Sequence, residues 1–190
     1  DFLGGLGKVT HAALVTDGNV ETPHAEQVAQ SLVEASVAVD MLVVEPGEPS
    51  KAIETAAVLW EKMLDLGADR KTVVVAVGGG VVGDLAGFIA ATYARGVRFF
   101  QVPTSLLAQV DSSVGGKVGI NLPGAKNMVG AFLQPLGVLI DTETLRTLPP
   151  REYTSGLGEV VKYGVILDAA LFDYFEANTA GLLARDHEDL

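Results

Sequence analysis

The chain of 190 residues carries a formal net charge of −11, and 48% of its residues are hydrophobic while 19% are charged. This acidic balance argues against general binding to nucleic acids or to anionic membranes, both of which attract positive surfaces. The chain has no cysteine, which excludes disulfides and thiolate metal sites, and no apolar run reaches the roughly 20 residues of a membrane-spanning helix. We therefore expect a soluble cytoplasmic protein with enough apolar residues for a core.

Short apolar runs alternate with helical patterns through most of the chain. Strands are expected at residues 11–17, 37–45, 73–77, 97–102 and 138–141, and helices at about 23–35, 53–66 and 81–93. The run at 73–77 is apolar at every position, which is typical of a strand buried on both faces. This alternation predicts an α/β fold with a Rossmann-like parallel sheet that helices cover on both faces. Residues 104–130 are glycine-rich and show no regular pattern.

The chain changes character at Pro149 and Pro150, after which the pattern is helical. Helices are expected at about 151–163 and 168–177, the second with Asp168 as its N-cap. We therefore expect an α/β domain of residues 1–149 and the beginning of an all-α domain at residues 150–190. About 40 residues are too few for an independent core, so the helical domain is expected to be incomplete.

A glycine-rich turn, Gly78-Gly79-Gly80-Val81-Val82-Gly83-Asp84, follows an expected strand and opens a helix. It matches G-x-G-x-x-G, in which close backbone approach and helix N–H groups bind a pyrophosphate. The Rossmann fingerprint fits poorly, because the turn follows the third strand and no acid stands about 20 residues further on. The alternative is a tight turn that packs a helix on a sheet, with Asp84 complementing the dipole in the first turn.

Positive charge gathers in the middle of this acidic chain. Residues 85–130 contain four basic side chains against one acid, a local charge of +3: Arg95, Arg98, Lys117 and Lys126 against Asp111. Basic side chains on glycine-rich backbone predict an anionic ligand, and Asn127 adds a directional donor. Solvated loop lysines are the alternative, and the spacing leaves both interpretations open.

Glu159 and Lys162 lie three positions apart on one expected helix face. They form either a surface ion pair or one carboxylate ligand of a metal with a lysine facing the same pocket. A metal site needs three or four ligands, and the three histidines of the chain form no H-x-x-x-H motif. The sequence therefore does not complete a metal site.

Four motifs together resemble the 3-dehydroquinate synthases, a family of sugar-phosphate cyclases, over nearly the whole chain. They are GGGVVGDLAGF, RGVRFFQVPTSLLAQVDSSVGGK, AKNMVGAF and TLPPREYTSGLGEVVKYG. The resemblance implies an NAD-binding α/β domain, a helical domain after it, and an active site between the two. It also implies a homodimer.

The resemblance assigns roles by position. Residues implied to contact NAD are Asp17, Asn19, Glu48, Lys51, Gly79, Gly80, Val81, Val82, Gly83, Asp84, Thr104, Ser105, Lys117, Lys126, Thr144 and Thr147. Many relatives have Thr-Thr where this chain has Thr104-Ser105. Residues implied to serve the phosphorylated sugar-acid substrate are Asp111, Lys117, Lys126, Asn127, Lys162 and, across the dimer, Arg95. Glu159 matches a ligand of zinc or another divalent metal such as cobalt.

The implied reaction converts 3-deoxy-D-arabino-heptulosonate 7-phosphate to 3-dehydroquinate and phosphate, a carbon–oxygen lyase step of the shikimate pathway that serves aromatic amino acid biosynthesis. Three alternatives are a cyclase that forms an inosose or a valiolone, a metal-dependent alcohol or glycerol dehydrogenase of similar fold, and a non-catalytic NAD-binding fragment. The family's histidine metal ligands would follow Leu190. We therefore expect the 190-residue chain alone to lack turnover.

Overall fold

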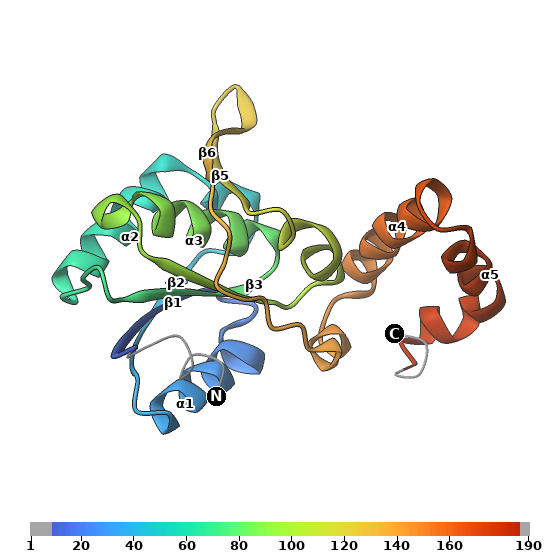
Figure 1. Ribbon diagram of the computed structural model, residues 1–190, viewed down its shortest axis with the longest axis horizontal. Coiled ribbons are helices and arrows are strands. Elements are labelled where there is room, and N and C mark those ends of the chain that lie inside the picture. Colours follow the sequence, from blue (N-terminus) through green and yellow to red (C-terminus); the bar gives the residue numbers. More distant parts are fainter. Residues whose placement is uncertain (1–8, 187–190) are drawn as a thin grey trace.

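The computed structural model describes residues 9–186, so the ends of both expected domains and His187 lie outside the described residues. Its centre is a parallel sheet of four strands in the order β2-β1-β3-β4 (Figure 1). The strands are β1 (His11–Asp17), β2 (Ala38–Val44), β3 (Val73–Gly78) and β4 (Arg98–Pro103). The helices are α1 (Glu26–Glu34), preceded by a π-helical turn η2 (Glu21–Ala25), α2 (Ile53–Asp65) and α3 (Gly80–Thr92). The expected α/β fold is confirmed.

Two apolar layers hold the sheet, one on each face. Val74 and Ala76 of β3 pack with residues of α2 and α3, whereas Val73, Val75 and Val77 pack with residues of α1 and η2. Figure 1 shows α1 on one side of the sheet and α2 and α3 on the other. A strand covered on both faces needs apolar side chains at every position, which explains the unbroken run in β3.

The order of the strands reverses between β1 and β3. From β1 the chain crosses to β2 on one side, and then returns to β3 on the other side. Residues of β1 and β3 pair in parallel, for example Val15 with Ala76, so both strands end at one edge of the sheet. In open α/β sheets this reversal beside the carboxyl ends of the strands is where ligands bind.

The glycine-rich region contains a hairpin that the sequence pattern does not predict. Strand β5 (Lys117–Leu122) pairs antiparallel with β6 (Ala125–Phe132), and the hairpin extends beyond α3 (Figure 1). Its two strands approach each other closely at glycines, since a Cβ on Gly130 would lie 2.2 Å from the carbonyl oxygen of Val118. Glycine lowers strand propensity, so a strand that needs glycine for close approach resembles a loop in sequence.

The expected strand at 138–141 is too long. Val138 forms one isolated parallel bridge with Gln101 of β4, and the N–H of Leu139 donates to the carbonyl of Gln101 at 2.9 Å. The chain then leaves the sheet, because Asp141 caps the 3-10 helix η6 (Thr142–Arg146) by accepting from the N–H of Glu143. The sheet therefore has a short irregular edge beside β4 instead of a fifth strand.

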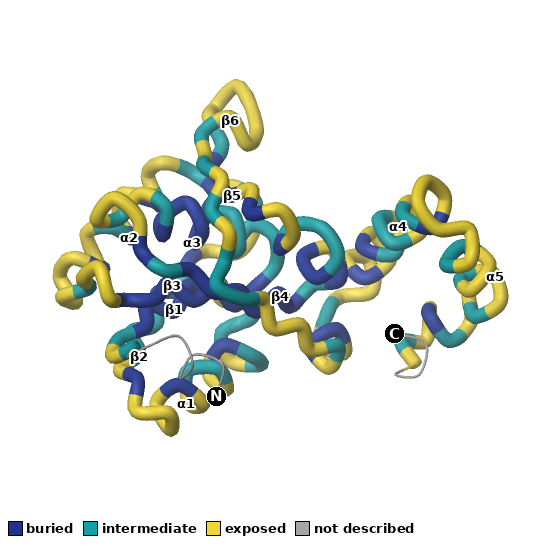
Figure 2. Tube along the Cα trace, viewed as in Figure 1, coloured by how far each residue is buried: buried dark blue, intermediate teal, exposed yellow. Residues whose placement is uncertain are grey.

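Two helices, α4 (Pro150–Ile166) and α5 (Ala169–Ala184), lie beyond one end of the sheet (Figure 1). Asp168 caps α5 as expected, accepting from the N–H groups of Ala170 and Leu171, and both helices are longer than the sequence pattern indicates. Tyr153 of α4 packs with Leu106 and Leu145 in a small separate cluster. Figure 2 shows that most of both helices is exposed or only partly buried. The division into domains 1–149 and 150–190 stays a prediction.

Within residues 9–186, no helix has the length and apolar character needed to cross a bilayer. The cytoplasmic location stays a prediction.

Two glycines of α4 test how closely this helix packs on the rest of the chain. A Cβ on Gly156 would lie 2.7 Å from the Cβ of Leu106 and 2.9 Å from the backbone nitrogen of Leu107. Gly156→Ala is therefore expected to destabilise the chain by about 1–3 kcal/mol through overpacking. Gly158→Ala is the matched control, since no atom lies within 4 Å of its Cβ and alanine favours a helix by up to about 1 kcal/mol. Equal midpoints of urea denaturation for the two variants would contradict the close packing.

Candidate functional site at the carboxyl edge of the sheet

The glycine turn stands at the carboxyl end of β3 and starts α3. Gly79 is the N-cap, Gly80 is the first helical residue, and the first helical bond runs from the N–H of Gly83 to the carbonyl of Gly79 at 3.0 Å. The first N–H groups of a helix lack partners within it and form the positive end of its dipole. Val82 is fully buried in the core, so its backbone alone can face a ligand. The first N–H groups of α3 are therefore suited to binding an anion.

The loop after β4 packs on the glycine turn. The hydroxyl oxygen of Ser105 lies 3.3 Å from where a Cβ of Gly79 would stand, and that of Ser112 lies 3.0 Å from a Cβ of Gly80. The N–H of Thr104 donates to the carbonyl of Gly78 at 3.0 Å. Both glycines therefore pack closely against serine side chains, as the alternative of a packing turn expects, and two hydroxyl groups flank the turn.

The loop after β1 ends at the same edge of the sheet. The carboxylate of Asp17 accepts a hydrogen bond of 2.9 Å from the N–H of Asn19, and the carbonyl of Asp17 accepts one of 3.0 Å from the N–H of Val20. These bonds make a compact turn at Asp17–Asn19. Since β1 and β3 are adjacent, this turn and the glycine turn flank the reversal of strand order.

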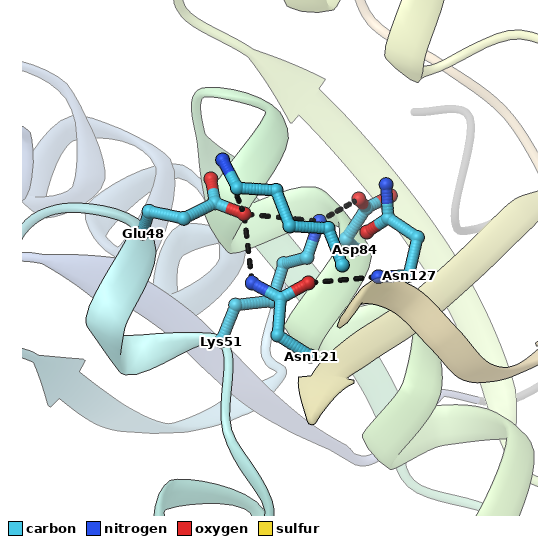
Figure 3. Close-up of polar contacts among 6 residues, drawn as sticks. Glu48, Lys51, Asp84, Asn121 and Asn127 are labelled. Atoms are coloured by element: carbon cyan, nitrogen blue, oxygen red, sulfur yellow. Dashed lines mark hydrogen bonds and ion pairs between the residues drawn. The ribbon is translucent and has the colours of Figure 1, made fainter. Parts of the chain in front are cut away.

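Four charged side chains form what we call the charge network: Glu48, Lys51, Asp84 and Lys126 (Figure 3). They come from the 3-10 turn η3 (Glu48–Ser50) and the residue after it, from α3, and from the hairpin. The ammonium of Lys51 donates to Asp84 at 2.6 Å and lies 3.9 Å from Glu48. The Lys126 ammonium lies 3.6 Å from the same Glu48 oxygen. The side chain of Lys51 is only 5% exposed, so this lysine depends on its carboxylate partners.

The expected position of Asp84 in the first turn of α3 is wrong. That turn contains no acidic residue, and Asp84 lies one residue beyond it, where it pairs with Lys51 instead of complementing the helix dipole. Burial raises the pKa of Asp84, and this effect outweighs the lowering by Lys51. The pKa of Glu48 is lowered, chiefly by the hydrogen bond from Asn121 and further by Lys51 and Lys126.

Asn121 is a site residue that the sequence interpretation missed. Its amide nitrogen donates to Glu48 at 2.7 Å, its amide oxygen accepts from the N–H of Asn127 at 2.8 Å, and its own N–H donates to the carbonyl of Lys51 at 2.8 Å. The available signal was an asparagine between the apolar residue Ile120 and a Pro-Gly turn. The glycine-rich composition around it concealed the strand.

The residues that the resemblance assigns to the substrate lie in the η5 turn, the hairpin and α4, apart from Arg95. Lys117 begins β5 and is near enough to Asp84 to act against the rise in the pKa of that carboxyl. Asp111 lies in the π-helical turn η5 (Ala108–Ser112) and contributes to a raised pKa of Lys162. The hydroxyl of Tyr163 donates to the carbonyl of Val110 at 3.3 Å, which ties α4 to this turn.

The positive stretch at 85–130 is not one surface, which corrects the expectation from sequence. Arg95 follows α3, and Arg98 starts β4, where its guanidinium donates to the carbonyl of Lys71. Both arginines stand at the amino edge of the sheet, whereas the glycine turn stands at the carboxyl edge. The 13 residues of α3 separate the two edges by about 20 Å, at about 1.5 Å per residue. Only Lys117 and Lys126 remain near the glycine turn.

Thr144 and Thr147 lie at the carboxyl edge of the sheet and belong to a second hydrogen-bond network, which is centred on Gln109. The buried amide of Gln109 donates to the carbonyls of Pro103 and Asp141 and to the hydroxyl of Thr144, at 3.1–3.2 Å. The hydroxyl of Thr147 shares a hydrogen bond of 2.6 Å with His24. Burial lowers the pKa of His24. Neither Gln109 nor His24 was among the expected site residues.

Glu159 and Lys162 form an ion pair on α4, and the hydrogen bond from Lys162 to Glu159 is the main cause of the raised lysine pKa. Among residues 9–186 no three histidine, aspartate or glutamate side chains gather closely enough to hold a metal ion. The described residues therefore do not form a complete metal site. The interaction that the structure shows for Glu159 is the ion pair with Lys162.

Comparison with known proteins decides the family. The family model described as 3-dehydroquinate synthase N-terminal matches residues 41–155, more than half of the chain. The chain belongs to the 3-dehydroquinate synthase family. A 3-dehydroquinate synthase from Rhodopirellula baltica is 51% identical over 189 residues, which are 100% of this chain and 50% of that relative. The chain thus spans about half the length of the curated 3-dehydroquinate synthases it matches.

Two solved cyclase structures share the fold. A 2-deoxy-scyllo-inosose synthase complexed with carbaglucose-6-phosphate, NAD+ and Co2+ is 35% identical with a TM-score of 0.80, over 84% of this chain and 44% of that one. A 2-epi-5-epi-valiolone synthase from Streptomyces hygroscopicus with NAD+ and Zn2+ bound is 32% identical with a TM-score of 0.85, over 93% and 49%. The 3-dehydroquinate synthase family thus shares its α/β fold with cyclases crystallised with NAD+ and a divalent metal.

Removing one partner of the Lys51–Asp84 pair should destabilise the chain. Asp84→Ala leaves Lys51 buried with only Glu48 near it, at 3.9 Å, and is expected to cost about 2–3 kcal/mol in urea denaturation. The double variant Lys51→Met/Asp84→Ala should recover most of the loss, since it leaves no buried charge. A double variant less stable than Asp84→Ala would contradict a dominant role of the ion pair.

The lowered pKa of Glu48 predicts a pH dependence of stability. A carboxyl whose pKa is lowered by folding stabilises the fold above its ordinary value of 4.5, and this contribution is lost as the pH falls through the folded-state value. The unfolding free energy should thus differ between wild type and Glu48→Gln above pH 4.5, by at most about 1 kcal/mol because Glu48 is partly exposed.

The difference in unfolding free energy between wild type and Glu48→Gln should vanish below the folded-state pKa of Glu48. Urea denaturation repeated over a pH series measures this. The raised pKa of Asp84 acts with the opposite sign, and it does not cancel fully in the comparison, because the Glu48 charge is one of its causes and Glu48→Gln removes that cause. A difference that does not change with pH would contradict the role of the Glu48 charge.

Proposed function

We propose that this chain is the cofactor-binding part of a 3-dehydroquinate synthase, which converts 3-deoxy-D-arabino-heptulosonate 7-phosphate to 3-dehydroquinate and phosphate. The observation that carries the proposal is the family match over residues 41–155, which includes both the glycine turn and the charge network. The enzyme is then an NAD- and metal-dependent carbon–oxygen lyase that eliminates phosphate and closes a ring.

The cofactor of this proposal is NAD, which when bound accepts a hydride from the substrate and later returns it. The first N–H groups of α3, at the glycine turn Gly79–Gly83, suit the pyrophosphate, since the turn stands at the carboxyl end of β3 beside the reversal of strand order. The N–H of Gly83 is already used within the helix, where it donates to the carbonyl of Gly79. Support also comes from two related cyclases whose structures contain NAD+. The other proposed NAD contacts are Asp17, Asn19, Glu48, Lys51, Asp84, Thr104, Ser105, Lys117, Lys126, Thr144 and Thr147.

The phosphorylated sugar acid is proposed to bind beside the hairpin. In this proposal Lys117 and Lys126 supply positive charge from the hairpin and Asn127 supplies a donor. Asp111 of the η5 turn and Lys162 of α4 are near enough to interact electrostatically with each other. Cationic groups around a leaving phosphate stabilise the negative charge that it gains. In this proposal the hairpin positions these side chains so that they hold the leaving phosphate and orient the sugar ring.

Arg95 is proposed to reach the substrate of a neighbouring subunit. It stands at the amino edge of the sheet, about 20 Å from the glycine turn along α3, and so is too far to serve the site of its own chain. Ala94 and Arg95 have φ values of 50° and 70°, so a tight left-handed turn presents this side chain. This part of the proposal requires a homodimer.

Glu159 is proposed as one carboxylate ligand of a divalent metal, either zinc or cobalt. The carboxylate is held by Lys162, and the two related cyclase structures contain Co2+ or Zn2+. Among the residues that the structure describes, no group of three possible ligands includes it. The proposal for this chain therefore extends to one ligand.

A cyclase that forms an inosose or a valiolone is the second candidate, because the two structural relatives make such products. Their identities of 35% and 32% are lower than the 51% of the 3-dehydroquinate synthase from Rhodopirellula baltica. The higher identity favours 3-dehydroquinate as the product.

The test is phosphate release by the full-length enzyme with NAD, a divalent metal and 3-deoxy-D-arabino-heptulosonate 7-phosphate, followed by identification of the product. Lys117→Ala should lower kcat by about 100-fold, because it removes a cation from the proposed phosphate site. Lys62→Ala, on the exposed face of α2, is the matched control and should keep full activity. Phosphate release from a hexose 6-phosphate, or from a heptulose 7-phosphate without a carboxyl group, but not from 3-deoxy-D-arabino-heptulosonate 7-phosphate, would favour the second candidate. NAD binding without turnover of any of these sugar phosphates would favour a non-catalytic module.

A further inference from the structure

One amide side chain connects the two halves of the proposed site. Figure 3 shows Asn121 between Glu48 and Asn127, with a hydrogen bond to each. A third bond runs from the N–H of Asn121 to the carbonyl of Lys51 at 2.8 Å. Asn121 therefore attaches β5 to the loop that holds two proposed cofactor contacts, and also fixes the turn that holds two proposed substrate contacts, Lys126 and Asn127.

Both contacts of the side chain require an amide. The carboxylate of Glu48 only accepts hydrogen bonds, and the backbone N–H of Asn127 only donates. The tip of the side chain at position 121 must therefore carry a donor and an acceptor at the observed distances of 2.7 and 2.8 Å. Aspartate lacks the donor, leucine lacks both groups, and glutamine is one carbon too long.

The bond to Asn127 also stabilises an unusual backbone. Asn127 has a φ of 58°, in the left-handed region that residues other than glycine rarely adopt. In the same turn, the ammonium of the preceding residue, Lys126, lies 3.6 Å from the carboxylate oxygen of Glu48. The carboxylate that Asn121 holds on one side thus also contacts the turn that Asn121 holds on the other.

We propose that Asn121 is a positioning residue that couples the cofactor-side loop at Glu48–Lys51 to the substrate-side turn at Lys126–Asn127. The proposal rests on the proposed function of these residues. Asn121 acts through its neighbours: it fixes one carboxylate oxygen of Glu48 and the backbone at Asn127, so that both loops keep one geometry. Since the two contacts use different atoms of one amide, substitutions can separate them.

Two variants of the full-length enzyme test this separation. Asn121→Asp keeps one oxygen for the N–H of Asn127 but places its second oxygen against the Glu48 carboxylate. KM for NAD should therefore rise roughly tenfold, while KM for the sugar phosphate changes less than about twofold. Asn121→Leu removes both contacts, so both KM values should rise roughly tenfold. A merely structural role would lower the melting temperature and kcat together and would not separate the two KM values.

A rescue experiment keeps the test decisive if Asn121→Leu does not fold. In Glu48→Gln/Asn121→Asp the donor and the acceptor are exchanged. Because Glu48 is itself a proposed NAD contact, the double variant is compared with both single variants, and rescue means a rise in KM for NAD smaller than the product of the two single rises. Gln30→Glu is the matched control, because the amide of Gln30 also donates to a glutamate, Glu34, at 2.9 Å, but on the exposed face of α1. It makes the same chemical change and should leave both KM values unaltered.

The outcomes separate this proposal from the proposed function. If the wild-type enzyme turns over and Asn121→Asp leaves both KM values unchanged, the positioning role is wrong and the enzyme assignment stands. Equal rises of both KM values in Asn121→Asp, or no rescue by the second substitution, would also overturn it. If the wild-type enzyme neither binds NAD nor releases phosphate, the proposed function itself fails.

Discussion

The ion pair between Lys51 and Asp84 is the contact on which the site depends. It joins the loop after β2 to α3, and a lysine that is only 5% exposed requires such a partner. Glu48 extends the pair to the hairpin through Lys126 and Asn121. Three segments distant in the sequence are thus held at one edge of the sheet, and two of their carboxyl groups have a pKa shifted by this arrangement, in opposite directions.

Helix α3 orders the molecule around this pair. Its first residues form the glycine turn, and its middle packs so tightly on the hairpin that a Cβ on Gly87 would lie 2.2 Å from a methyl carbon of Val118. Its far end leads to Arg95 at the opposite edge. The length of α3 therefore sets the distance between the glycine turn and Arg95. Because Arg95 is too remote to serve the site at the glycine turn, its proposed role needs a second subunit.

The site combines two kinds of support for negative ligands. The glycine turn provides N–H groups of a helix N-terminus, while Lys117 and Lys126 provide charge from a hairpin. In this chain with a net charge of −11, the positive stretch at 85–130 is divided: Lys117 and Lys126 belong to the hairpin, whereas Arg95 and Arg98 stand at the amino edge of the sheet. The proposed dinucleotide would draw on the glycine turn, whereas Lys117 and Lys126 are proposed to contact both the dinucleotide and the phosphorylated substrate. Asn121 lies between Glu48 and Asn127.

The sequence by itself determined the order and type of most elements, because apolar periodicity and the all-apolar β3 are local patterns. The family followed from the resemblance of four sequence motifs, and the match of the family model confirmed it. The tertiary structure decided the rest. The bond from Asn121 to Glu48 joins residues 73 positions apart, and β5 and β6 contain glycines that close packing requires but that reduce strand propensity. The separation of Arg95 and Arg98 from the lysines depends on the direction of α3, which charge counting along a chain does not contain. Local propensity specifies elements, whereas a site depends on which of their ends meet in space.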